Sequence, residues 1–113
     1  MAEPKMTMAL LRILAVLLED PAAKHYGLEL CKAAGMRSGS VYPLLMRLEQ
    51  QGWLSSDWEQ ADPHKEKRPR RRFYQLTSLG ERGARAMLHD AQQALARGTR
   101  HPLGSPTPGG MPA

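Results

Sequence analysis

The stretch SGSVYPLLMRLEQQGWL, residues 38–54, decides the fold of this chain. Four aliphatic residues in it recur at the spacing that places them on one face of a helix: Val41, Leu44, Leu45 and Leu48. Pro43 stands among them, although a proline in a helix interior removes a backbone donor and costs about 3 kcal/mol. On a helical wheel Pro43 points away from the aliphatic face. The stretch therefore predicts a helix with one face in a core, a proline on the other face, and an end at Gly52.

The start of this helix decides what the proline costs. If Ser40 is the N-cap, Pro43 falls in the first turn, where its missing N–H has no partner to lose. If Ser38 is the N-cap, one backbone hydrogen bond to Gly39 is lost. We favour the start at Ser38, with a small irregularity near the proline.

The face that carries the proline has residue types that contact DNA. Away from the aliphatic residues lie Gly39, Pro43, Met46, Arg47 and Gln50, with Ser38, Ser40 and Tyr42 beside them. Hydroxyl groups and the free amides of a first turn can bind phosphates, and glycine lets the backbone come close. A proline offers apolar surface to a thymine methyl. The residues by themselves leave open the alternative that the proline is merely tolerated in a first turn.

Two helices are expected before this stretch. From Met6 an apolar stripe predicts the first helix: Leu10, Ile13, Leu14, Leu17 and Leu18. The Asp-Pro pair at 20–21 ends it, because the residue before a proline avoids the helical region. A second helix is expected from residue 23 or 25 to residue 34, with Gly35 as its stop. Cys31 lies on its apolar face, and we expect a buried structural thiol there.

The residues after the stretch predict a hairpin and a fourth helix. Residues 53–59 and 71–76 have strand composition, and the charged residues 60–69 between them indicate a loop. Trp53 and Trp58 are expected to pack the hairpin. A helix is predicted over 78–97, and its cap, Thr77 or Ser78, stays open, since Ser78 and Glu81 have capping-box spacing.

This order of elements predicts a mainly α fold with a small β-hairpin (α+β): a winged helix-turn-helix domain plus one C-terminal dimerisation helix. In that fold the third helix enters a DNA groove, and the hairpin, or wing, touches the adjacent backbone or minor groove. The expected organisation is a flexible lead at 1–5, the DNA-binding domain at 6–77, the dimerisation helix at 78–97 and a disordered Pro/Gly-rich tail at 98–113.

The positive charge of the chain is concentrated on the expected wing. The formal net charge is +5 over 113 residues. The segment 65–72 alone sums to +5, from the acid Glu66 and six basic residues: Lys65, Lys67, Arg68, Arg70, Arg71 and Arg72. Such a patch indicates a polyanionic partner. Strand alternation places Arg71 and Phe73 on one face and Arg72 and Tyr74 on the other.

Three segments resemble the PadR family of bacterial transcriptional regulators: YGLEL at 26–30, SGSVYPLLMRLEQQGWL at 38–54 and RRRFYQLTSLG at 70–80. The resemblance implies a homodimeric winged-helix repressor on a near-palindromic operator of double-stranded DNA. It implies that Ser38, Gly39, Ser40, Tyr42 and Pro43 lie near DNA, with basic wing residues on the backbone; we add Arg47 from the same helix face. Leu28 stands where the family usually has tyrosine, and the single C-terminal helix matches the short subgroup.

The fourth helix carries a seam for a partner chain. Ala84, Leu88, Ala91 and Leu95 recur at alternating spacings of four and three. We expect dimerisation through the first and fourth helices, with an interface that comprises Leu10, Leu14, Ala84, Met87, Leu88, Ala91 and Leu95. The alternative is that this helix packs onto its own domain. A small hydrophobic effector between two such helices stays open, with Met87 and Leu88 as lining residues.

Other classes of function find little support. The four histidines have no nucleophile or carboxylate at a recognisable spacing, so neither catalytic residues nor a cofactor are expected. One cysteine and no apolar run of about 20 residues indicate an intracellular, cytoplasmic protein without a membrane span. Two alternatives remain: a metal- or ligand-sensing winged helix of another family, for which Cys31, His25 and His89 form no recognisable cluster, and a winged helix that binds protein or RNA.

Overall fold

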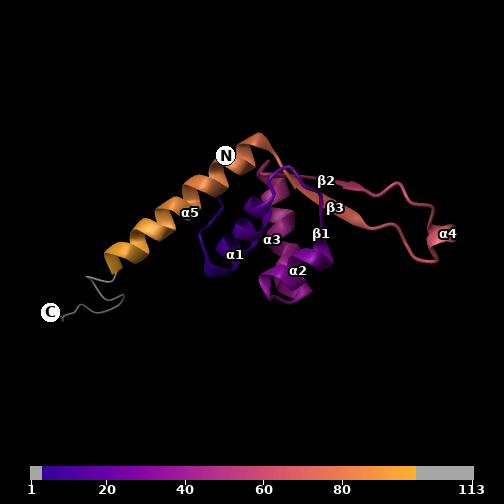
Figure 1. The fold of residues 1–113 in the computed structure, drawn as a ribbon, viewed down its shortest axis with the longest axis horizontal. Helices are drawn as coiled ribbons and strands as arrows, with labels where there is room; N and C mark the ends of the chain where they lie inside the picture. The colour runs from indigo at the N-terminus through magenta and orange to yellow at the C-terminus, as the bar shows by residue number, and fades with distance from the viewer. Residues whose placement is uncertain (1–3, 99–113) are drawn as a thin grey trace.

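The computed structural model describes residues 4–98, in which a hairpin and a long helix project in opposite directions from a helical body (Figure 1). The elements follow in the order α1 (Met8–Glu19), β1 (His25–Tyr26), α2 (Gly27–Ala34), α3 (Ser38–Gln50), β2 (Leu54–Trp58), α4 (Pro63–Glu66), β3 (Arg72–Leu76) and α5 (Ser78–Gly98). This arrangement is the mostly helical winged fold that the sequence predicts. The expected tail lies largely in residues 99–113, outside the described part.

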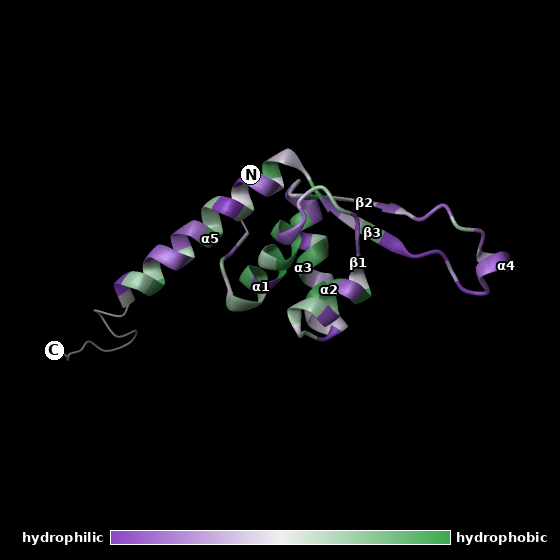
Figure 2. Ribbon diagram, in the orientation of Figure 1, coloured by the Kyte–Doolittle hydropathy of each residue, from purple (hydrophilic) through white to green (hydrophobic). Residues whose placement is uncertain are grey.

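The core is built where apolar stripes of α1 and α3 face each other. Its fully buried large side chains are Leu10, Ile13, Leu14, Leu17, Leu30, Val41, Leu45 and Leu48. Figure 2 shows these helices in green, while the wing is mostly purple. Leu44, predicted for the core, is only partly buried, and Cys31 is 8% exposed, as expected of a structural thiol.

The third helix begins at Ser38, as favoured, but neither serine caps it. Its N-cap is Arg37, whose carbonyl accepts the N–H groups of Ser40 at 3.0 Å and Val41 at 3.1 Å. Pro43 is therefore interior to the helix and cannot donate to the carbonyl of Gly39. Because Gly39 is exposed, water can satisfy that carbonyl. The proline is tolerated because the turn it disrupts faces solvent.

The sheet has three strands, one more than the predicted hairpin. The strand order is β1-β3-β2, and all neighbours are antiparallel. His25 and Tyr26 pair with Tyr74 and Phe73, so α2 begins only at Gly27. Two residues are too few for a periodicity signal, and only the pairing with β3 makes them a strand. The expected loop also holds one helical turn, α4.

Helix α5 is capped by one of the two residues that the sequence left open, and it is docked against Trp53. Thr77 is the cap: its hydroxyl accepts the N–H of Gly80 at 2.9 Å, whereas Glu81 pairs with Arg85 at 2.8 Å. Trp53, 5% exposed, lies under the first turns of α5, where a Cβ at Gly83 would meet its ring, and it shares the core with residues of β2 and β3. A Cβ at Gly80 would lie 2.0 Å from its carbonyl oxygen, so the helix can dock this closely only because residue 80 is glycine.

Candidate nucleic-acid interface

The solvent face of α3 presents the residues expected near DNA. Ser38, Gly39, Ser40, Tyr42, Pro43, Met46, Arg47 and Gln50 are all exposed. Val41, Leu45 and Leu48 on the opposite side are fully buried, which fixes the rotation of the helix about its axis. The last five exposed residues, from Tyr42 to Gln50, line an open depression of about 410 Å³ along the helix. Most of the face is polar or small, as a helix needs in order to enter a groove.

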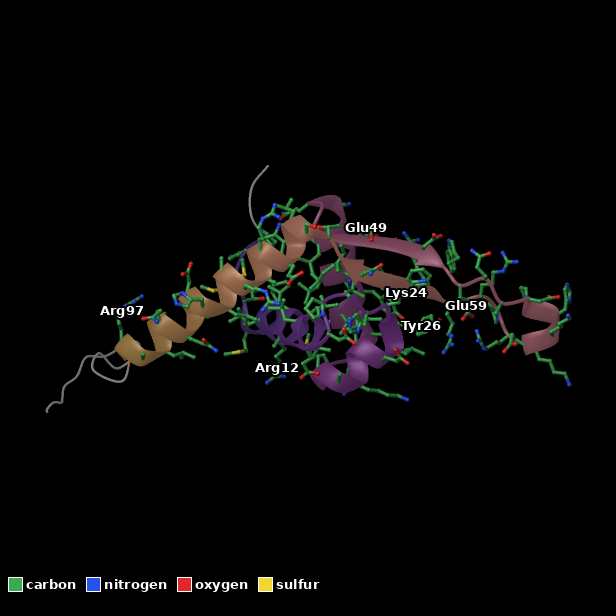
Figure 3. All side chains as sticks on the ribbon, turned by 45° about the horizontal axis from the view of Figure 1, so that its top comes forward. Arg12, Lys24, Tyr26, Glu49, Glu59 and Arg97 are labelled. Carbon is green, nitrogen blue, oxygen red and sulfur yellow. The ribbon has the colours of Figure 1, made fainter. Side chains whose placement is uncertain are left out.

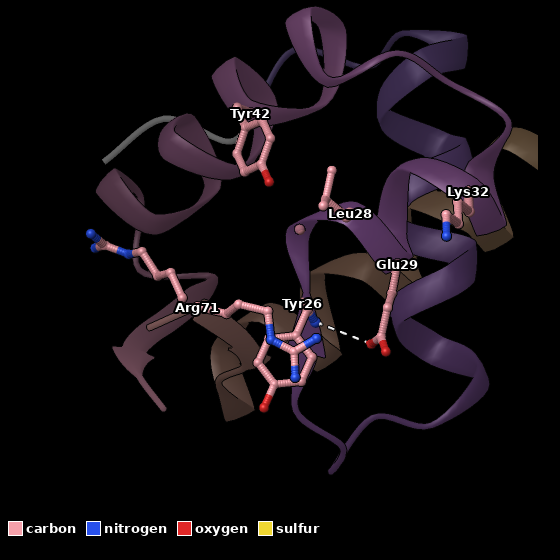
Figure 4. Close-up of a pocket in the computed structure, with 8 residues that line it drawn as sticks. Tyr26, Leu28, Glu29, Lys32, Tyr42 and Arg71 are labelled. Atoms are coloured by element: carbon pink, nitrogen blue, oxygen red, sulfur yellow. Dashed lines mark hydrogen bonds between the residues drawn. The ribbon is translucent and has the colours of Figure 1, made fainter. Parts of the chain in front are cut away.

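Tyr42 differs from its neighbours because it also packs inside the chain. It is 39% exposed, and a Cβ at Gly27 would lie 2.5 Å from its hydroxyl oxygen. Its ring therefore rests on the first residue of α2, and a larger residue there would displace the end of the tyrosine side chain. The hydroxyl group points into a pocket between α2, α3 and the foot of the wing (Figure 4).

That pocket has a volume of about 330 Å³ and a mixed lining: Tyr26, Gly27, Leu28, Glu29, Lys32, Tyr42, Arg71 and Arg72. Leu28 is 61% exposed at its edge, so an apolar side chain stands where the resembling family has tyrosine. Glu29 accepts the backbone N–H of Tyr26 at 3.4 Å and is held back toward the start of α2. The pocket connects α3 to the wing along one continuous surface.

The foot of the wing is organised around one carboxylate that the sequence did not single out. Glu59 accepts hydrogen bonds from the Arg68 guanidinium, from the Arg71 backbone N–H at 2.9 Å and from Arg71 Nε at 3.4 Å. The Tyr26 hydroxyl donates to it at 3.4 Å. The hydrogen bond from Arg68, against the opposing effect of burial, helps to lower the pKa of Glu59 from 4.5 to about 2. The carboxylate is therefore ionised at neutral pH.

The two faces of β3 carry the alternation predicted from the sequence. Arg71 lies 4.1 Å over the ring of Tyr26, and the Phe73 ring meets the same tyrosine edge-on at 6.5 Å. Arg72 turns the other way. It forms an ion pair with Glu49 of α3 at 3.3 Å and donates to the Ser56 hydroxyl at 2.6 Å. This second network connects the wing to the C-terminal end of α3.

The acidic residues of the wing reduce the net positive charge that it presents. Over residues 59–72 there are six basic and three acidic residues, so the segment carries +3. Lys65 and Lys67 are exposed, and no ion pair of theirs occurs within residues 4–98. Among the described residues, the Arg70 side chain donates only to the carbonyl of Ala61, at 2.9 Å. The sequence places Glu59 at the end of the strand that pairs with β3, but the charge sum over residues 65–72 does not include it.

Most of the expected dimer residues lie in the core of their own domain, which corrects that expectation. Leu10, Leu14 and Ala84 are at most 1% exposed and have no surface left for a second chain. Met87 and Ala91 are 7% and 9% exposed, and Leu88 packs partly against the same core. Leu95, by contrast, is 56% exposed. The first half of α5 packs on its own domain because the start of the helix is docked on Trp53.

An apolar groove lies beside Leu95, in a place the sequence did not indicate. Its volume is about 250 Å³, and its lining is Met6, Thr7, Met8, Leu11, Ala91, Ala94 and Leu95. Met6 and Met8 are 50% and 63% exposed. The groove joins the segment before α1 to the second half of α5.

No group of three or more His, Cys, Asp or Glu side chains within residues 4–98 is placed to hold a metal ion. None of the helices described has the length and hydropathy needed to cross a bilayer.

Comparison with known proteins agrees with this geometry. No curated protein matches the chain. A PadR-like transcription factor from Bacteroides fragilis is similar in structure, with a TM-score of 0.64, 26% identity and coverage of 83% of this chain and 88% of the other. A PadR family transcription regulator from Clostridium difficile R20291 gives a TM-score of 0.67 at 18% identity, covering 82% and 96%.

The structure is also similar to BpsR of Bordetella bronchiseptica, whose DNA binding is regulated by 6-hydroxynicotinic acid. The TM-score is 0.64 at 21% identity, over 86% of this chain and 67% of the other. The model of the transcriptional regulator PadR-like family matches residues 13–86, which run from the middle of α1 through α2, α3 and the wing to the first turns of α5. Because that match covers well over half of its length, the chain belongs to the PadR-like family of transcriptional regulators.

Proposed function

We propose that this chain binds a near-palindromic operator in double-stranded DNA as a homodimer and represses transcription there. The observation that carries the proposal is the solvent face of α3, which is exposed from Ser38 to Gln50 while its other face is locked into the core. A rigid helix that presents such a face fits the major groove.

The first turn of α3 is suited to phosphate and base edges. Nothing lies within 4 Å of the position that a Cβ would take at Gly39, so the backbone is open to close approach. Ser38, Ser40 and Tyr42 supply hydroxyl donors for phosphates, and Arg47 follows on the same face. Pro43 offers apolar surface to a thymine methyl.

The wing supplies affinity that does not depend on sequence. Lys65, Lys67 and Arg70 are the cations best placed for phosphates, because none of them is paired with a carboxylate in residues 4–98. Arg68, Arg71 and Arg72 are held by Glu59 and Glu49 and contribute less. Phosphate contacts of this kind fix the position of a protein on DNA, while base contacts select the sequence.

A second copy of the chain would cover the apolar groove. Met6, Met8 and Leu95 expose large apolar surface around it, and the last turns of α5 project beyond the domain (Figure 1). In a two-fold dimer each groove would receive the other protomer's α5. The two α3 helices would then read half-sites about one helical turn, roughly 34–36 Å, apart.

Selection from a pool of random duplexes tests this proposal. We expect enrichment of a two-fold symmetric sequence, binding of that duplex in preference to single-stranded DNA and RNA, and sedimentation as a dimer at micromolar concentration. Placing the selected sequence over a reporter promoter should lower transcription when the protein is expressed. Preference for RNA, or enrichment of no sequence, would contradict the proposal.

A further inference from the structure

Glu59 lies on the wing just after the end of β2, with Tyr26 on another strand of the same sheet (Figure 3), and it contacts side chains from three segments. Tyr26 belongs to β1, Arg68 lies near the end of the wing loop, and Arg71 immediately precedes β3. The Glu59 side chain is 9% exposed, whereas those of Arg68 and Arg71 are 34% and 47% exposed. A nearly enclosed carboxylate thus holds two guanidinium groups that still reach the surface.

We propose that Glu59 is a positioning residue that withholds Arg68 and Arg71 from DNA phosphates and so limits the sequence-independent affinity of the wing. This inference rests on the proposed function, because it concerns how strongly the same surface binds duplex DNA. One acidic residue thereby determines how many cations of the wing are free to bind phosphates.

The contacts around each arginine support this assignment. A phosphate that recruits Arg71 must replace both its bond to Glu59 and its stacking over the Tyr26 ring. A phosphate that recruits Arg68 must compete with Glu59, with Glu66 at 3.8 Å and with the Pro69 carbonyl at 3.1 Å. Lys65 and Lys67 are exposed and have no such competitor within the described residues.

Limiting the number of free cations has a use in a DNA-binding regulator. Each phosphate contact adds about 0.9 to the slope of log affinity against log salt, irrespective of sequence. A genome offers on the order of 10⁶–10⁹ competing sites, so strong sequence-independent binding would keep the protein away from its operator. Glu59 reduces that competition without removing the arginines from the wing.

The decisive comparison is between Glu59→Gln and Glu66→Gln. Both variants remove one negative charge from the same wing, but Glu66 is half exposed and, within the described part of the chain, forms an ion pair with Arg68 alone. Binding of each variant to a random duplex is measured by fluorescence anisotropy from 0.05 to 0.3 M salt, values chosen to span the steep range. We expect Glu59→Gln to steepen the salt slope by about 0.9 to 1.8 and to tighten binding about tenfold at 0.1 M salt. Glu66→Gln should change the salt slope by less than about 0.45, which is half the effect of one phosphate contact.

A purely structural role for Glu59 would give the opposite result. If the carboxylate only keeps the wing folded, Glu59→Gln weakens binding and leaves the slope equal to or shallower than that of Glu66→Gln, which overturns the inference. Failure of the wild-type chain to bind any duplex overturns the proposed function and this inference together. Wild-type binding without the expected difference between the variants overturns this inference alone.

A second pair of variants keeps the test decisive if Glu59→Gln does not fold. Lys67 and Arg68 are adjacent on the wing, and each loses one charge on substitution by glutamine. Lys67→Gln should flatten the salt slope by about 0.9, while Arg68→Gln should flatten it by less than about 0.3, because Arg68 is already engaged. Equal flattening by the two substitutions would show that Glu59 withholds nothing.

Discussion

Substitution of Gly39 by alanine should separate the stability of this protein from its binding to DNA. Gly39 is exposed within the first turn of α3, and an added Cβ meets no atom within 4 Å. Alanine restricts the unfolded chain more than glycine does, so the substitution should stabilise the fold by about 0.4–1 kcal/mol. For a domain of this size that gain corresponds to a rise of about 2–8 °C in melting temperature.

The same methyl group should weaken operator binding. It stands where we propose that the α3 backbone approaches a phosphate, and the loss of one hydrogen bond to a charged group costs about 1.5–3 kcal/mol. That cost corresponds to about ten- to hundredfold in the dissociation constant. Urea denaturation gives the first quantity, and fluorescence anisotropy with the selected duplex gives the second.

Gly80→Ala is the matched control, because it adds the same methyl group to another helix start. There the Cβ would lie 2.0 Å from the Trp53 carbonyl oxygen, and overpacking should cost about 1–3 kcal/mol of stability or more. If Gly39→Ala instead binds the operator as tightly as wild type, the first turn of α3 does not approach DNA. If it lowers the melting temperature, the first turn of α3 is not where we place it.

Three further predictions address other parts of the molecule. Tyr42→Phe should weaken duplex binding by about 1 kcal/mol with little change in stability to urea. Leu45→Ala, at a position that is 0% exposed, should instead cost about 2–5 kcal/mol of stability. A large loss of stability in Tyr42→Phe would show that the hydroxyl group stabilises the fold. Leu95→Asp should give a stable monomer in sedimentation with weak operator binding, because Leu95 is 56% exposed in a single chain; a surviving dimer would place the interface elsewhere. Folding lowers the pKa of Glu59 from 4.5 to about 2, so the contribution of this carboxylate to stability is complete above about pH 4.5 and is lost as the pH falls toward 2. Glu59→Gln should lack this part of the pH dependence of the melting temperature. Identical pH profiles for the variant and the wild type would contradict the role given to the carboxylate.

The sequence alone was enough to place the four longer helices, the hairpin and the buried face of α3. Apolar spacing in residues 38–50 determines which face of that helix is buried, because a helix in water must bury its aliphatic stripe. Gly35 and Gly52, with φ of 67° and 79°, end their helices in the left-handed conformation that glycine adopts most readily. These features depend on neighbours along the chain, so a local pattern reveals them.

The tertiary structure decided whatever depends on residues far apart in the sequence. The two residues of β1 form a strand only because β3, nearly fifty residues later, supplies partners. Trp53 docks α5 because Gly80 and Gly83 leave room for it, which buries the helix face that spacing alone assigned to a partner chain. Glu59 neutralises part of the wing because pairing of the strands brings it to Arg68 and Arg71. Charge counted along the sequence measures what the wing contains, whereas packing determines how much of that charge is free to meet DNA.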